Sequence, residues 1–194
     1  MDQKRSAERA PRERLLDTAY ELFSQRGIRG VGIEEVIERA GVAKATLYRH
    51  FPSKDDLVLA FLERRHEHWT SDIQEAQTRR IDGLPEDRLL AIFDVLDERF
   101  RSGEFDAYLF FNALLEMGAD HPAGRASVRH VEHIRSIVRD LADQAGLCDT
   151  EDFARSWHIL MKGSIIAAAE GDPAAALHAQ AMGRGLIERH RPPG

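Results

Sequence analysis

Apolar residues recur at helical intervals along almost the whole chain. One set falls on a single helical face near the amino terminus, and a second set follows the i, i+3, i+4, i+7 pattern shortly afterwards. The positions are Leu15, Leu16, Ala19, Tyr20, Leu22 and Phe23 in the first set, and Ile33, Val36, Ile37 and Ala40 in the second. Because no segment alternates apolar and polar residues convincingly, the pattern predicts an all-α fold.

Glycine and proline residues divide the chain into about nine predicted helices. Three short helices are expected first, near residues 12–26, 33–40 and 44–51. A longer helix should start at Lys54, because Ser53 is a suitable N-cap and Asp56 lies at the third helical position. Since short helices are unstable in isolation, the first three must pack on one another.

The segment EEVIERAGVAKATLYRHF contains a helix, a short turn and a second helix, which is the pattern of helix-turn-helix DNA-binding proteins. Gly41 can adopt the left-handed backbone conformation that ends the first helix. At about 100° per residue, Leu47 and Phe51 share one face and should pack on the preceding helices. Ala45 and Arg49 then point outward, where a helix in the major groove would meet base edges.

The charge distribution confines any contact with a polyanion to the amino-terminal third. The chain has 194 residues and a formal net charge of -6, which excludes a wholly basic nucleic-acid binder. Basic residues outnumber acidic ones over residues 1–54, whereas acidic residues predominate afterwards. The first basic side chains could form an arm in the minor groove or a solvated tail: Lys4, Arg5, Arg9, Arg12 and Arg14.

The stretch AYELFSQRGIRGVGIEEVIERAGVAKATLYRHFPSKDDL, within residues 12–60, resembles the TetR family of bacterial transcriptional regulators. The resemblance implies a DNA-binding domain of three helices, in which the second and third form the helix-turn-helix. It also implies DNA-contacting positions at Lys44, Ala45, Thr46, Tyr48, Arg49, His50 and Lys54. The ammonium group of Lys54 and the amides at the start of its helix suit a phosphate.

The sequence departs from the family pattern at three positions. Gly32 and Ala43 stand where Ser or Thr caps are usual, and Ala45 stands where glycine is common. We therefore expect weaker helix caps, by a few tenths of a kcal/mol for Gly and about 1 kcal/mol for Ala. The methyl group of Ala45 should also change which bases are accepted.

The resemblance further implies a DNA-binding helix-turn-helix domain over residues 1–54 and a larger helical domain over residues 55–194 for ligand binding and dimerisation. Aromatic and apolar residues crowd the second domain, where they form either a ligand pocket or a solid core. The candidate ligand-binding residues are Phe93, Phe100, Tyr108, Phe111, Asn112, Glu116, Trp157, His158 and Met161. The polar members Asn112, Glu116 and His158 would orient a ligand.

Small residues recur near the carboxy terminus and would let two helices approach closely. A pair of such helices from each chain predicts an isologous four-helix contact, with packing inside one chain as the alternative. The candidate interface residues are Gly163, Ser164, Ala167, Ala168, Ala175, Ala179, Met182 and Leu186.

No motif for a cofactor or a metal is present, and we predict neither, with metal sensing by histidines as the alternative. The histidines nearest to acidic residues in sequence lack a tight ligand spacing and are expected on the surface: His121, His130, His133 and His158. Cys148 is the only cysteine, which excludes an intrachain disulfide and suits a reducing cytoplasm. No stretch is apolar enough to span a membrane.

These observations favour a homodimeric regulator, most simply a repressor, that binds a near-palindromic operator and is released by a small-molecule effector. Two alternatives remain open. One is a ligand-independent architectural protein with a solid carboxy-terminal core. The other is an enzyme that uses the aromatic cavity, although the sequence has no recognisable nucleophile elbow or phosphate loop.

Overall fold

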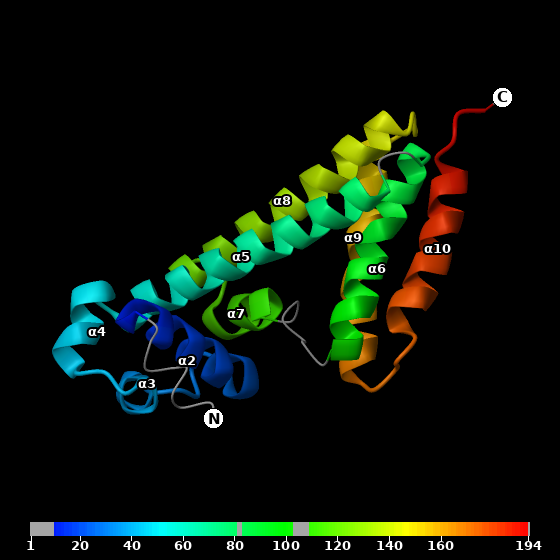
Figure 1. The fold of residues 1–194 in the computed structure, drawn as a ribbon. Coiled ribbons are helices and arrows are strands. Elements are labelled where there is room, and N and C mark those ends of the chain that lie inside the picture. Colours follow the sequence, from blue (N-terminus) through cyan, green and yellow to red (C-terminus); the bar gives the residue numbers. More distant parts are fainter. Residues whose placement is uncertain (1–9, 81–82, 103–108, 194) are drawn as a thin grey trace. The chain divides into compact units, whose positions relative to one another are not determined.

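The computed structural model describes residues 10–80, 83–102 and 109–193 (Figure 1). In this part of the chain all regular secondary structure is helical, so the predicted all-α class is confirmed. The helices described are α2 (Pro11–Arg26), α3 (Ile33–Ala40), α4 (Lys44–His50), α5 (Lys54–Arg79), α6 (Pro85–Ser102), α7 (Leu109–Met117), α8 (Pro122–Gln144), α9 (Thr150–Ala169) and α10 (Ala175–Arg189). Within the described ranges, no helix is long and apolar enough to cross a membrane.

The chain divides into two compact units. The amino-terminal unit comprises residues up to Arg65 together with Leu109–Val128, and the carboxy-terminal unit comprises His66–Tyr108 and Arg129–Gly194. The boundary between packing units therefore lies beyond residue 54, because the first turns of α5 and all of α7 belong to the amino-terminal unit. The division into a DNA-binding and a ligand-binding domain stays a functional prediction.

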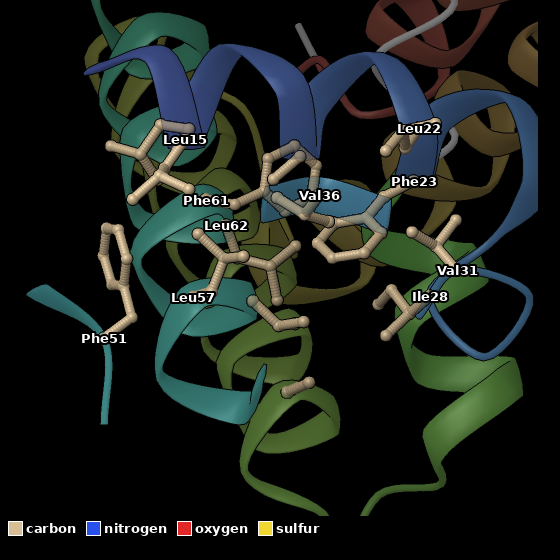
Figure 2. Close-up of a cluster of buried hydrophobic side chains, with 14 of the residues drawn as sticks. Leu15, Leu22, Phe23, Ile28, Val31, Val36, Phe51, Leu57, Phe61 and Leu62 are labelled. Carbon is tan, nitrogen blue, oxygen red and sulfur yellow. The ribbon is translucent and has the colours of Figure 1, made fainter. Parts of the chain in front are cut away.

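One apolar core holds the amino-terminal unit together (Figure 2). Phe23 of α2 and Phe61 of α5 meet edge to face, with ring centroids 5.7 Å apart. Val36 of α3 is fully buried in the same core, and Phe110 brings α7 to it. Each large side chain buried in this way stabilises the fold by roughly 1.5–3 kcal/mol, so the three short helices are stable only as part of this core.

In the carboxy-terminal unit, α10 packs against both α9 and α6. Trp157 of α9 is fully buried, and its ring lies 5.1 Å from that of Phe93 on α6 and 5.2 Å from that of Phe153. A β-carbon added to Gly183 of α10 would lie 3.0 Å from Trp157 and 3.2 Å from Phe93. Glycine at this position therefore allows α10 to approach the aromatic core closely.

Candidate nucleic-acid interface

The turn between α3 and α4 has the geometry that the sequence predicts. Gly41 has φ 63° and ψ 42°, which confirms the left-handed conformation that ends α3. Its backbone N–H donates to the carbonyl of Glu38 at 3.1 Å, and the N–H of Val42 donates to Ile37 at 3.3 Å. These bonds satisfy carbonyls at the end of α3 and set the direction in which α4 starts.

Helix α4 is anchored by one buried face and presents the other to solvent. Leu47 is fully buried and Phe51 is 3% exposed, so both contribute to the core as expected. Ala45 and Arg49 are exposed on the opposite side, and Tyr48 is 40% exposed. The predicted outward direction of this face is confirmed, while its contact with DNA stays a prediction.

The other predicted DNA-contacting residues of α4 are less free. Thr46 and His50 are only half-exposed. Lys44 is exposed, but its ammonium group lies 2.6 Å from a carboxylate oxygen of Glu34 on α3. The hydrogen bond to Glu34 and its negative charge raise the pKa of Lys44. A phosphate would therefore have to compete with Glu34 for this cation.

Lys54 has an internal partner that the sequence did not indicate. Its Nζ donates to the backbone carbonyl of Ile28 at 2.6 Å, and burial lowers its pKa. Glu116, from α7, accepts a hydrogen bond at 3.0 Å from the backbone N–H of Arg29. The turn between α2 and α3 is thus held at two points by side chains from α5 and α7. Gly27 leaves room for this, since a β-carbon there would collide with the Glu116 carboxylate.

The capping pattern follows the sequence closely. The backbone N–H of Asp56 donates to Oγ of Ser53 at 3.1 Å, and that hydroxyl donates to the Asp56 carboxylate at 2.6 Å. The predicted cap of α5 is therefore confirmed. Gly32 and Ala43 make no capping hydrogen bond from a side chain, because neither residue has a side-chain oxygen.

The arm considered for the minor groove falls mostly on Lys4, Arg5 and Arg9, which lie outside the described residues. Arg12 and Arg14 belong instead to α2. The guanidinium of Arg12 lies over the ring of Phe51, 5.6 Å from its centroid, and that of Arg14 donates to the carbonyl of Gly41 at 3.4 Å. Both side chains therefore brace the helix-turn-helix from α2.

The structure distributes the candidate ligand-binding residues over both units. Phe93, Trp157, His158 and Met161 are buried in the carboxy-terminal unit, and Phe100 is half-buried there. Phe111, Asn112 and Glu116 lie on α7 in the amino-terminal unit. Tyr108 lies outside the described residues. The set as a whole therefore does not line one site within a single unit.

The candidate interface residues divide between two faces of α9 and α10. Five are buried inside the carboxy-terminal unit: Ser164, Ala168, Ala175, Ala179 and Leu186. Gly163 and Met182 are exposed and Ala167 is half-exposed. The small residues let α9 and α10 pack closely within one chain, which was the alternative interpretation. The large apolar residues left exposed on these helices are Ile159, Ile166, Leu177 and Met182, at 68%, 41%, 45% and 63%.

The expectation that the histidines lie on the surface was wrong for two of them. His130 is 8% exposed and His158 is 7% exposed. His66, which the sequence did not single out, brings its Nδ1 to 2.8 Å from Nδ1 of His130, and its ring centroid lies 4.9 Å from that of His133. The described residues contain no group of three or more His, Cys, Asp or Glu side chains arranged to hold a metal ion.

Together, the glycine turn, the anchored α4 and the all-helical second unit define a helix-turn-helix protein of two helical parts. Residues 15–61 match the family of bacterial regulatory proteins described as the tetR family. The whole fold is similar to a TetR-family transcriptional regulator from Streptomyces coelicolor, with a TM-score of 0.87, 29% identity, and coverage of 94% of this chain and 96% of the other. The matched residues are thus those of a TetR-family DNA-binding region, and the fold of the chain is similar to that of a TetR-family regulator.

Two curated relatives come from Mycolicibacterium smegmatis. The transcriptional activator FasR is 36% identical over 99 residues, which are 48% of this chain and 45% of FasR. The transcriptional repressor KstR is 29% identical over 156 residues, which are 79% of this chain and 71% of KstR. The chain thus spans less than half of the first relative and over two thirds of the second.

Proposed function

We propose that this protein is a sequence-specific DNA-binding transcriptional regulator that acts as a homodimer. The observation that carries the proposal is the exposed face of α4, where Ala45, Tyr48 and Arg49 point away from the buried anchor Leu47. A guanidinium group can bind the O6 and N7 acceptors of guanine bidentately, and the alanine methyl can contact the methyl group of thymine. A backbone turn held by Gly41 keeps this face in a fixed orientation.

Dimerisation is supported by the exposed apolar residues on α9 and α10. Ile159, Gly163 and Ile166 are spaced by four and three residues along α9, so they share one face of that helix. Leu177 and Met182 add exposed apolar surface on α10. A second copy of the chain would remove these side chains from water, and an isologous contact would use each of them twice.

A dimer would present two copies of α4 to successive major-groove faces about 34–36 Å apart, or a multiple of that distance. The operator should therefore be a near-palindrome. Repression is the simplest mode of action, because a bound dimer occludes the operator without needing a further contact. A small molecule would release DNA if it binds better to a conformer in which this spacing is lost.

Selection of bound duplexes from a random DNA pool tests the proposal. We expect a near-palindromic consensus, and we expect Arg49→Ala to lose about 1–3 kcal/mol of discrimination at one base position in each half-site. Arg79→Ala is the matched control, because it removes the same charge from an exposed position outside the helix-turn-helix. If Arg49→Ala reduced binding to the consensus and to random DNA equally, or if no consensus emerged, the assignment of this face would be wrong.

A further inference from the structure

The carboxy-terminal unit contains a group of buried and half-buried nitrogen-bearing side chains that we call the basic cluster. Its members are His66 on α5, His130, His133 and Arg135 on α8, and His158 and Lys162 on α9. The ring of His66 contacts the rings of His130 and His133, and His158 acts electrostatically on His130. Arg135 and Lys162 act in turn on His158.

His158 is the member with unmet hydrogen-bonding capacity. The residue is 7% exposed, and neither of its ring nitrogens has a hydrogen-bond partner. Leaving a buried polar group unpaired destabilises a fold. Nε2 of His133 is also buried without a partner. Such groups call for a partner that the described part of the chain does not supply.

Arg135 on α8 is a cation whose positive charge acts on His158. Its side chain is half-buried and has no hydrogen bond or ion pair with any described residue. The contrast with Arg139, one turn further along α8, is direct, because Arg139 is paired with Glu151 at 3.3 Å. Arg99 in the same unit is likewise paired with Asp72. A half-buried guanidinium without a counter-ion is therefore unlike its neighbours.

The charges around His158 favour a negatively charged ligand group. Burial, and then the positive charges of Lys162 and Arg135, lower the pKa of His158 to about 4. At neutral pH the imidazole is therefore uncharged and can donate one N–H, while Arg135 supplies a positive charge and a planar fork of donors. Neutral ligands would leave that charge uncompensated, whereas a carboxylate accepts from both groups.

We propose that the effector of this regulator is an organic carboxylate, whose carboxylate group binds Arg135 and His158 between α8 and α9. The assignment rests on the proposed regulatory function, since it names the chemical class of the molecule that would release DNA. Binding would remove an unpaired guanidinium and an unpaired imidazole together. Any such ligand therefore gains affinity from groups that are already in place.

Direct binding to the DNA-free protein tests this assignment separately from regulation. Octanoate and benzoate are titrated calorimetrically, alongside octanamide, benzamide and inorganic phosphate. We expect at least one carboxylate to bind and its amide to bind at least about 10-fold more weakly, because the amide lacks the charge that Arg135 recognises. Equal binding of acid and amide, binding of phosphate alone, or no binding of either acid would overturn the proposal.

Variants assign the binding to the cluster. Arg135→Gln should weaken carboxylate binding by about 10- to 100-fold, while Arg139→Gln, which removes the same charge one turn away on α8, should leave it unchanged. Arg135→Lys keeps the charge but loses the fork, and should also weaken binding, which provides a second test if the glutamine variant does not fold. Equal affinities in wild type and the folded Arg135 variants would refute the assignment.

The two levels of failure are distinguishable. Carboxylate binding that does not release the selected operator would leave the site intact and remove its regulatory role. Operator binding with no carboxylate binding would leave the DNA-binding function intact and remove the ligand class.

Discussion

Lowering the pH from about 7.5 to about 5 should destabilise the carboxy-terminal unit. Burial lowers the pKa of His130 to about 3 and that of His158 to about 4, from an ordinary value of 6.5. Neighbouring histidines contribute to the first shift, and Lys162 and Arg135 contribute to the second. Between pH 6.5 and these lowered values the unfolded chain binds protons that the folded chain does not, so stability falls as the pH falls.

The magnitude follows from the two pKa values. Each histidine alone would contribute about 2 kcal/mol of destabilisation between pH 7.5 and pH 5, and the two together would contribute about 4 kcal/mol at most. The loss levels off about one pH unit below the lower of the two pKa values. With a urea dependence of about 1–3 kcal/mol/M, the shift in the denaturation midpoint should be about 2 M.

Tryptophan fluorescence in urea measures this unit selectively, because both tryptophans of the chain, Trp69 and Trp157, are buried in it. His158→Gln removes one of the two titrating groups and should reduce the pH-dependent loss of stability by about 2 kcal/mol. His68→Gln is the control, since His68 is exposed on α5 in the same unit. The reasoning fails if His158→Gln and the wild type lose the same stability between the two pH values.

Three further predictions concern the interface and the dimer. Gly41→Val should lower the melting temperature and reduce operator binding, because φ 63° disfavours a β-branched residue by at least about 1–2 kcal/mol; an unchanged melting temperature would contradict this. Lys54→Ala should weaken binding to all DNA sequences with little change in salt dependence, because its ammonium holds the carbonyl of Ile28; a slope reduced by about one charge would instead indicate a phosphate contact. Met182→Asp should yield a folded monomer in sedimentation, since this side chain is 63% exposed, and a persistent dimer would place the interface elsewhere.

Local sequence patterns were sufficient for the helix-turn-helix. The buried positions Leu47 and Phe51 are four residues apart on one side of the helix axis, so their burial alone directs Ala45 and Arg49 outward. The glycine at position 41 likewise predicts a left-handed backbone conformation, because other residues adopt that conformation at a higher energy. These features can be predicted from residue types that lie only a few positions apart in the sequence.

Burial of polar groups depended on contacts between segments far apart in sequence. From the sequence, Lys54 is a cation at the start of a helix with no evident partner. In the structure, the turn at Ile28 comes close enough for its backbone carbonyl to accept a hydrogen bond from Lys54. The sequence suggests Glu116 as a pocket residue, whereas in the structure its carboxylate accepts a hydrogen bond from the backbone N–H of Arg29. Neither partner is adjacent in the chain, so periodicity and charge carry no signal for them.

For α9 and α10, the sequence likewise could not predict which apolar residues are buried. The sequence determined that α9 and α10 are helices rich in small residues, and that such helices can pack closely. It could not determine which face of each helix is buried within the chain, because apolar residues occur on more than one face. Only the tertiary structure decided that Ala168 and Ala179 turn inward while Ile159 and Met182 stay exposed, since that choice depends on where α6 supplies a complementary surface.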